Sequence, residues 1–282
     1  MNLLGKDSSL VQRIVAGIIG APFIVWFFYR EGLVLFVFLV PLSILCQWEL
    51  YRMFQGRVRQ SQTILGYVTG TFILTDGFLN EGGYLGEILM TGIAAAFIIE
   101  IINREDHKLD NIALSLFAIF YPSVFISYMF RIDNLPVRIF GSYRQHMLLY
   151  MLLCIWIFDT ASYFTGRMFG RHPFFPRISP KKTVEGFLGG LVGTMGAAFA
   201  FSVVFEPKLL AYFLMLTLVI VISGQIGDLS ESIIKRDMNI KDSSQLIPGH
   251  GGILDRFDSL IFAGPAVYLF LSLLVIWGGF SQ

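Results

Sequence analysis

The sequence GQIGDLSESIIKRDMNIKDSSQLIPGHGGILDRFD, residues 224–258, concentrates charge in a chain that is otherwise apolar. Apolar runs at 209–223 and 260–277 flank it, and each is long enough to belong to a membrane helix. A solvated loop between two membrane helices would be the ordinary explanation. It does not account for acids and bases that alternate beside a Gly-His-Gly-Gly sequence, or for Asp228 so close to apolar sequence, where charge is costly. We therefore place the functional site in this stretch, at the edge of a membrane.

The residue types in this stretch favour a site for a metal ion and phosphate groups. If the preceding helix continues, one face of it carries Asp228, Glu231, Ser232 and Lys235. Asp255 and Asp258 are three residues apart and follow the glycine-rich run 249–252. Carboxylate oxygens bind hard divalent ions, whereas Lys, Arg and the amides of a glycine-rich turn suit phosphate. Together they predict a metal–nucleotide phosphate site.

Composition places the chain in a membrane. Hydrophobic residues make up 55% and charged residues 15% of it, whereas a soluble domain carries about 25% charged residues. The net charge of +1 gives no indication of a nucleic-acid partner. We expect an integral membrane protein.

The hydropathy pattern predicts an all-α, polytopic membrane protein with about nine transmembrane helices. The apolar segments lie near 14–29, 32–51, 63–80, 84–103, 111–130, 146–166, 184–205, 208–227 and 259–278. Acidic residues at the edges of the third and fourth segments leave open two half-membrane elements there. The polar chemistry lies in the second half, so we expect a scaffold and dimer surface of about five helices at 1–142 and a catalytic region of about four helices at 143–282.

Lysine and arginine set the orientation, because they accumulate in cytoplasmic loops. With the N-terminus inside, most of the 21 such residues fall in cytoplasmic segments. The two richest loops, after the sixth and eighth helices, then face the cytoplasm. The predicted site lies at the cytoplasmic membrane face.

A second group of polar residues follows the sixth helix. Asp159 lies within an apolar span, and an intramembrane carboxylate indicates function unless a neighbour such as Arg167 pairs with it. The basic loop after it contains Arg171 and Arg177, which the positive-inside rule alone could explain.

At these residues the chain resembles the phosphatidate cytidylyltransferases, also called CDP-diacylglycerol synthases. The C-terminal signature of that family is matched in order and spacing by Ser232, Lys235, Arg236, Lys241, Asp242, Ser244, Pro248, His250, Gly251, Gly252, Asp255, Arg256 and Asp258. The segment 179–186, preceded by Asp159-Thr160 and Gly166-Arg167, resembles an upstream block of the same family. The resemblance covers about the last half of the chain, and the first half matches only in hydropathy.

The resemblance implies a reaction of CTP with phosphatidic acid that gives CDP-diacylglycerol and pyrophosphate, and it implies Mg²⁺, with room for a second cation. Asp228 and Asp255 are the leading Mg²⁺ ligands, and Asp258 and Glu231 support them. The side chains expected to hold the triphosphate or the lipid phosphate are Lys182, Lys235, Arg236, Lys241 and Arg256. Further substrate contacts are expected from Thr183, Glu185, Ser232, Asp242, His250, Gly251 and Gly252, with Asp159 on the lipid side. Lys182 stands where a helix N-terminus would help it to bind an anion.

The resemblance also implies a multi-pass protein of the plasma (inner) membrane of a bacterium, with membrane lipid as a partner and room for a homodimer formed through membrane helices. Two other classes stay open. A CTP-dependent kinase of a polyprenyl or long-chain alcohol would act on a hydroxyl group, and the intact signature disfavours it. A transporter should have polar or broken helices in both halves, whereas this chain has its polar chemistry in one.

Overall fold

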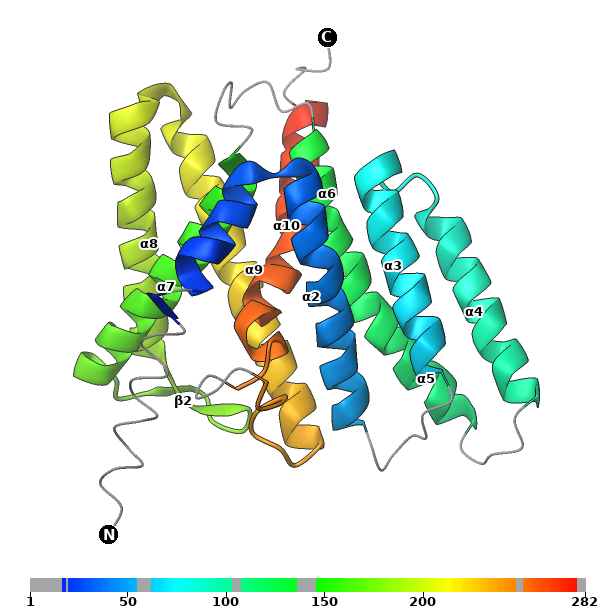
Figure 1. Ribbon diagram of the computed structural model, residues 1–282. Helices are drawn as coiled ribbons and strands as arrows, with labels where there is room; N and C mark the ends of the chain where they lie inside the picture. The colour runs from blue at the N-terminus through cyan, green and yellow to red at the C-terminus, as the bar shows by residue number, and fades with distance from the viewer. Residues whose placement is uncertain are drawn as a thin grey trace. The chain divides into compact units, whose positions relative to one another are not determined.

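The structure, a computed structural model, describes residues 17–18, 20–54, 62–102, 108–135, 146–246 and 251–277 (Figure 1). These residues are almost all helical, as predicted. In chain order the elements are α2 (Gly32–Met53), α3 (Thr63–Asn80), α4 (Leu85–Ile102), α5 (Lys108–Ala118), the π-helical turn η1 (Ile119–Val124), α6 (Phe125–Asn134), α7 (Met147–Phe169), β1 (Pro173–Phe175), β2 (Ser179–Thr183), α8 (Val184–Phe205), the 3₁₀ turn η3 (Pro207–Leu209), α9 (Leu210–Asp237) and α10 (Leu254–Trp277). A further helical stretch at 20–30 precedes α2.

Seven helices in the described residues are long and apolar enough to cross a membrane. They correspond to seven of the predicted segments, with Lys108–Asn134 counted as one span. The segment predicted at 63–80 is helix α3, but its threonines, glycines and Asp76 lower its hydropathy and it is not among the seven. The first predicted segment lies partly outside the described residues. The multi-pass helical architecture is confirmed, and the number nine stays a prediction.

Contacts divide the chain into two compact units. The first comprises Met1–Arg131 with Asp237–Phe257, and the second comprises Ile132–Arg236 with Asp258–Gln282. Most of the signature, residues 237–257, packs with the N-terminal helices. The signature is therefore shared between the two units. The expected division into a scaffold at 1–142 and a catalytic region at 143–282 stays a prediction.

In the first unit, α3 packs against α2, α4 and η1. Polar side chains join these helices: the amide of Gln47 on α2 donates to the carbonyl of Gly66 and to Ser123 Oγ, at 3.2 and 2.8 Å. The π-helical turn coincides with Pro122, which cannot donate an intrahelical hydrogen bond.

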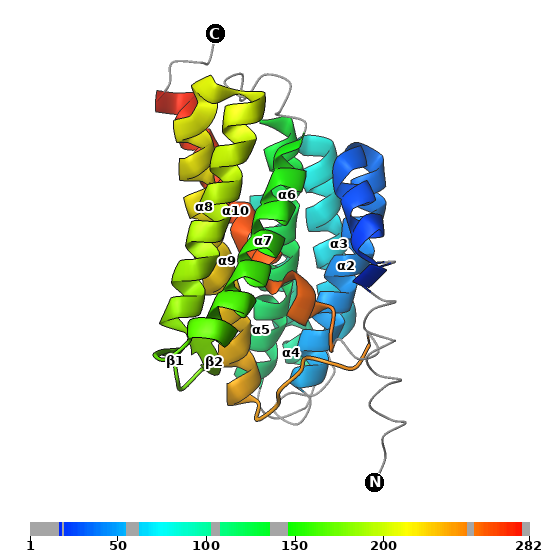
Figure 2. The same cartoon turned by 90° about the vertical axis from the view of Figure 1, so that its left-hand side faces the viewer.

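In the second unit, α7 and α8 form a closely packed antiparallel pair (Figure 2). Glycines on α8 allow this approach: a Cβ added at Gly190 would lie 1.9 Å from Ser162 Oγ, and one at Gly189 would lie 2.3 Å from Thr165 Oγ1. Between the two helices the chain forms the antiparallel hairpin β1–β2, where the sequence indicated only a loop. Pro173 pairs with Thr183 in this hairpin, and α8 begins at the next residue.

Helix α9 continues for 28 residues, past its apolar run and through the start of the signature. The predicted helical face at residues 228–235 is therefore confirmed. The charged residues that follow the apolar run therefore also lie on α9, up to Arg236 within the second unit.

Candidate active site

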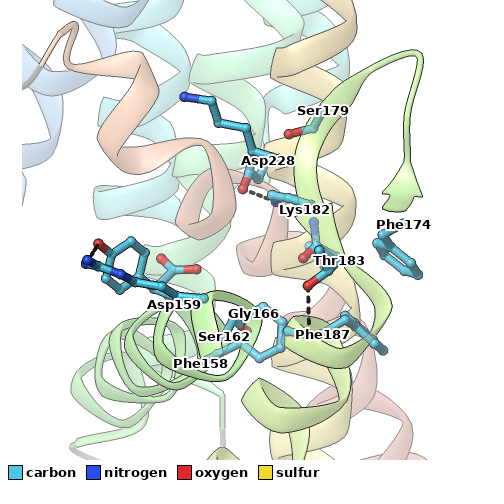
Figure 3. A pocket seen from close by; sticks show the side chains of 15 residues that line it. Phe158, Asp159, Ser162, Gly166, Phe174, Ser179, Lys182, Thr183, Phe187 and Asp228 are labelled. Carbon is cyan, nitrogen blue, oxygen red and sulfur yellow. Dashed lines mark hydrogen bonds and ion pairs between the residues drawn. The ribbon is translucent and has the colours of Figure 1, made fainter. Parts of the chain in front are cut away.

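A cavity of about 470 Å³ lies in the second unit between α7, the hairpin, the start of α8 and α9 (Figure 3). One side of it is aromatic, with Phe158, Phe174 and Phe187. Phe174 from the hairpin stacks on Phe187 from α8, with ring centroids 5.0 Å apart. Polar side chains from α7, the hairpin and α9 line the rest, so the cavity can accept a ligand with an apolar part and a charged part.

The central polar contact is an ion pair between Lys182 and Asp228 (Figure 3). Lys182 lies on β2, two residues before α8 begins, and Asp228 lies on α9. The exposed fractions of their side chains are 26% and 29%, so both are accessible from the cavity. Asp159 on α7 lines the same cavity. The structure thus brings together three of the predicted residues from three elements.

Two buried polar groups line the cavity without a hydrogen-bond partner among the described residues. They are the amide nitrogen Nε2 of Gln225 and the hydroxyl of Ser162. Gln225 is only 7% exposed. Burying an unsatisfied polar group costs free energy, so a ligand that accepts a hydrogen bond would stabilise this arrangement. Sequence reasoning missed Gln225, although its position three residues before Asp228 places both on one face of α9.

Asp258 lies near this cluster. Its carboxylate is repelled by Asp228 and Asp159 and attracted by Lys235, and it accepts a hydrogen bond from the backbone amide of Ser259 at 2.5 Å. In the part of the chain that the structure describes, no three His, Cys, Asp or Glu side chains are close enough to hold a metal ion by themselves. Lys235 Nζ is 2.5 Å from Glu231 Oε2, and Glu231 is fully buried. Neither Glu231 nor Lys235 lines the cavity, so their predicted roles in metal and phosphate binding gain no support from it.

Two residues predicted to contact substrate form hydrogen bonds at the two ends of the hairpin. Thr183 lines the cavity and also caps α8, because its hydroxyl accepts a hydrogen bond from the Gly186 amide at 3.1 Å. Glu185 accepts from the backbone amides of Arg171 and His172 at 3.0 and 3.2 Å, and His172 Nδ1 lies 2.5 Å from its other oxygen. Glu185 does not line the cavity, so a structural role is the one its contacts support.

Two other signature residues on α9 also lie outside the cavity lining. Arg236 donates from Nε to the carbonyl of Ile178 at 3.2 Å and joins α9 to the hairpin. Ser232 is buried.

In the first unit, Asp255 is held by the loop that precedes it. Its Oδ2 atom accepts hydrogen bonds from the amide and hydroxyl of Ser243, both at 3.0 Å, and from the amide of Gly252 at 2.9 Å. Asp255 and Asp228 belong to different units, so their pairing at one metal ion stays a prediction.

Other signature residues belong to the first unit. Three of them are exposed: Lys241, Asp242 and Arg256. Gly251 has a φ of +84°, a conformation that favours glycine. His250, predicted to contact substrate, lies outside the described residues.

The sequence analysis also missed Glu49, on α2. This side chain is fully buried and accepts four hydrogen bonds from residues 243–254. The signal was present in the sequence, because Glu49 is a carboxylate at the end of an apolar span, the same feature that singled out Asp159.

These observations define a class of protein: a multi-pass membrane protein whose cavity presents a lysine, carboxylates and unsatisfied hydrogen-bond donors beside aromatic side chains. The family model described as "Cytidylyltransferase family" matches residues 11–274. The chain therefore belongs to the cytidylyltransferase family, and it is a nucleotidyltransferase enzyme.

Individual relatives agree along most of the chain. It is 31% identical to a phosphatidate cytidylyltransferase of Bacillus subtilis (strain 168) over 270 residues. This aligned stretch is 94% of this chain and 98% of that protein. A phosphatidate cytidylyltransferase of Staphylococcus saprophyticus is 32% identical over 268 residues, 93% of this chain and 97% of that protein. One of Aquifex aeolicus (strain VF5) is 40% identical over 164 residues, 58% of this chain and 59% of that protein. The similarity to the first two includes the N-terminal half, which sequence motifs alone did not cover.

Proposed function

We propose that this chain transfers the CMP moiety of CTP to phosphatidic acid and releases pyrophosphate. The relatives named for this activity match it along more than nine-tenths of its length. The observation that carries the proposal is the cavity in which Lys182 meets Asp228, 46 positions away in sequence, beside an aromatic wall. A lipid phosphate and a nucleotide need this combination of apolar and charged surface.

In the reaction, an oxygen of the lipid phosphate attacks the α-phosphorus of CTP. The bond between that phosphorus and the bridging oxygen breaks, and pyrophosphate leaves with the electron pair. Both reactants are anionic, so their repulsion must be reduced before they can meet. Lys182 supplies a positive charge at the N-terminal end of α8, where the helix dipole adds to it. Gln225 and Ser162 supply donors for phosphate or base oxygens, and no covalent nucleophile on the protein is required.

The residues also suit a magnesium ion. Mg²⁺ binds oxygen and commonly takes one or two protein carboxylates, with substrate phosphates and water as its other ligands. Asp228 fits as the leading carboxylate, with Asp159 in the same cavity and Asp258 in electrostatic contact with both. When bound, the ion would neutralise charge on the transferring phosphoryl group. With Asp228 engaged in this way, Lys182, its partner in the structure, would be available to a substrate phosphate.

The excess of Lys and Arg in the loops after the sixth and eighth predicted helices supports an active site that faces the cytoplasm, where CTP is found. The bacterial relatives and the apolar helices support a location in the plasma membrane of a bacterium. A homodimer through membrane helices stays a prediction.

The proposal is tested with purified protein in lipid nanodiscs, incubated with CTP, Mg²⁺ and phosphatidic acid. We expect pyrophosphate and CDP-diacylglycerol in equal amounts. The matched control replaces phosphatidic acid by a long-chain polyprenol. CDP and a polyprenyl phosphate from the control, with no pyrophosphate from phosphatidic acid, would identify a lipid kinase instead.

A further inference from the structure

Glu49 lies in the N-terminal half, far in sequence from any residue that the family signature contains. It is on α2 and its exposed fraction is 0%. An isolated buried carboxylate is costly unless several donors satisfy it. The contacts of Glu49 therefore indicate why the chain tolerates it.

All four of the hydrogen bonds described for Glu49 come from the connection between α9 and α10, residues 238–253, and the first residue of α10. Oε1 accepts from the hydroxyl of Ser244 at 2.6 Å and the amide of Ile253 at 2.8 Å. Oε2 accepts from the hydroxyl of Ser243 at 2.8 Å and the amide of Leu254 at 2.7 Å. Glu49 thus caps the N-terminus of α10 from another helix, by satisfying amides that have no partner within α10.

Glu49 is also linked to the signature residue Asp255. The hydroxyl of Ser243 lies 2.8 Å from Glu49 Oε2 and 3.0 Å from Asp255 Oδ2. Since a hydroxyl group has one hydrogen, it can donate fully to only one carboxylate at a time. We therefore expect a change at Glu49 to alter the share of this hydroxyl hydrogen that Asp255 receives.

The packing around this contact is tight. A Cβ added at Gly252 would lie 1.8 Å from Ser243 Oγ and 2.7 Å from both oxygens of Glu49. Phe257, one helical turn into α10, contacts Phe38 on α2 with ring centroids 6.0 Å apart. The start of α10 is thus held to α2 by polar and aromatic contacts.

We infer that Glu49 is a positioning residue for the reaction: it fixes the start of α10 and, through Ser243, the side chain of Asp255. The inference rests on the proposed function, because it assigns the fixed segment to catalysis. In this assignment Glu49 acts through the signature segment.

Two substitutions separate this role from simple packing. Glu49→Gln keeps the shape of the side chain but replaces one acceptor oxygen by a donor, which must then face a backbone amide. Glu49→Asp keeps both acceptor oxygens and removes a methylene. If the acceptors matter, the kcat of the Gln variant falls on the order of 30-fold, and the Asp variant recovers part of that loss. A packing role predicts the reverse order, and a Gln variant as active as the Asp variant, or more active, would overturn the inference.

Gln47→Leu is the matched control. Gln47 lies on the same helix, is fully buried, and bonds to Gly66 and Ser123 instead of the signature segment. We expect it to lower the thermal midpoint but to leave kcat within a few-fold of wild type. An equal loss of kcat in Gln47→Leu would mean that Glu49 acts only through global stability.

Amide hydrogen exchange supplies a readout that does not depend on turnover. In Glu49→Gln, peptides that contain Ser243 or Leu254 should exchange faster, whereas peptides from α7 should not. If Glu49→Gln does not fold, Ser244→Ala removes one of the four hydrogen bonds and should give a smaller change in the same peptides. Unchanged exchange in these peptides would overturn the inference even if wild-type protein lacked cytidylyltransferase activity, so the two proposals fail separately.

Discussion

The ion pair between Lys182 and Asp228 allows a catalytic role to be separated from a structural one by a single substitution, Lys182→Gln. The pair is partly exposed, with side-chain exposed fractions of 26% and 29%. Ion pairs of this kind contribute about 0–1 kcal/mol to stability. Lys182→Gln should therefore shift the thermal midpoint of the purified protein by only a few degrees.

The effect on the rate should be larger. Two unit charges about 4 Å apart interact by about 4 kcal/mol at an effective dielectric constant of about 20. Because the cavity is partly open to solvent, we take about half of this, ~2 kcal/mol, for the interaction of Lys182 with a substrate phosphate. This corresponds to a loss on the order of 30-fold in kcat/KM, and a loss of at least ~10-fold is the minimum that the assignment requires.

Arg171→Gln is the control for loss of positive charge in the same loop. Arg171 is exposed, its side chain does not line the cavity, and the contact it makes with Glu185 uses its backbone amide, which the substitution keeps. Its kcat/KM should stay within a few-fold of wild type in the pyrophosphate-release assay. Comparable kinetics of the two variants, both intact or both lost, would refute the assignment of Lys182 to phosphate binding.

Three further predictions follow from the same structure. Asp228→Asn should lower kcat at least ~100-fold, because metal stabilisation of a transferring phosphate is worth several kcal/mol; turnover close to wild type would exclude Asp228 as a metal ligand. Gly252→Ala should lower the thermal midpoint by the equivalent of about 1–3 kcal/mol, since the added methyl group meets Ser243 and Glu49, and an unchanged midpoint would contradict that packing. In a cysteine-free background, cysteines at Gln245 and Gln282 should be labelled from the cytoplasm and from outside, respectively, and labelling of both from one side would rule out nine spans.

The helices were predictable because apolar segments of about 20 residues that cross a membrane form helices, which satisfy their own backbone hydrogen bonds. The predicted segment 63–80 coincides with α3, and the predicted 184–205 coincides with α8. The hairpin was not predictable, because Ser179–Thr183 contains a proline and two lysines and has no alternation of apolar and polar residues. Its pairing depends on neighbours: α8 follows directly, and Arg236 on α9 holds the carbonyl of Ile178.

Part of the site was predictable for a different reason. Asp159, Lys182 and Asp228 each stood out by local context, as a charge in or beside an apolar span or at the start of a helix. The structure brings them to one cavity. Glu231 and Lys235 lie on the same helical face as Asp228 by their spacing in the sequence. A spacing of four residues also allows the two side chains to form an ion pair with each other, and in the structure they do. Sequence spacing gives the shared face and does not distinguish these two outcomes.

Gly252 shows why the remaining roles required coordinates. From the sequence, a glycine after His250 indicates close approach of a phosphate to the backbone. In the structure the space a side chain would need is taken by Ser243 and by Glu49, a residue about 200 positions earlier in the chain. Both explanations predict that alanine is harmful, but they predict different effects: loss of nucleotide affinity for a phosphate contact, and loss of stability for a steric one. The contact distances favour the steric explanation, and with it a direct dependence of the C-terminal signature on the N-terminal helices.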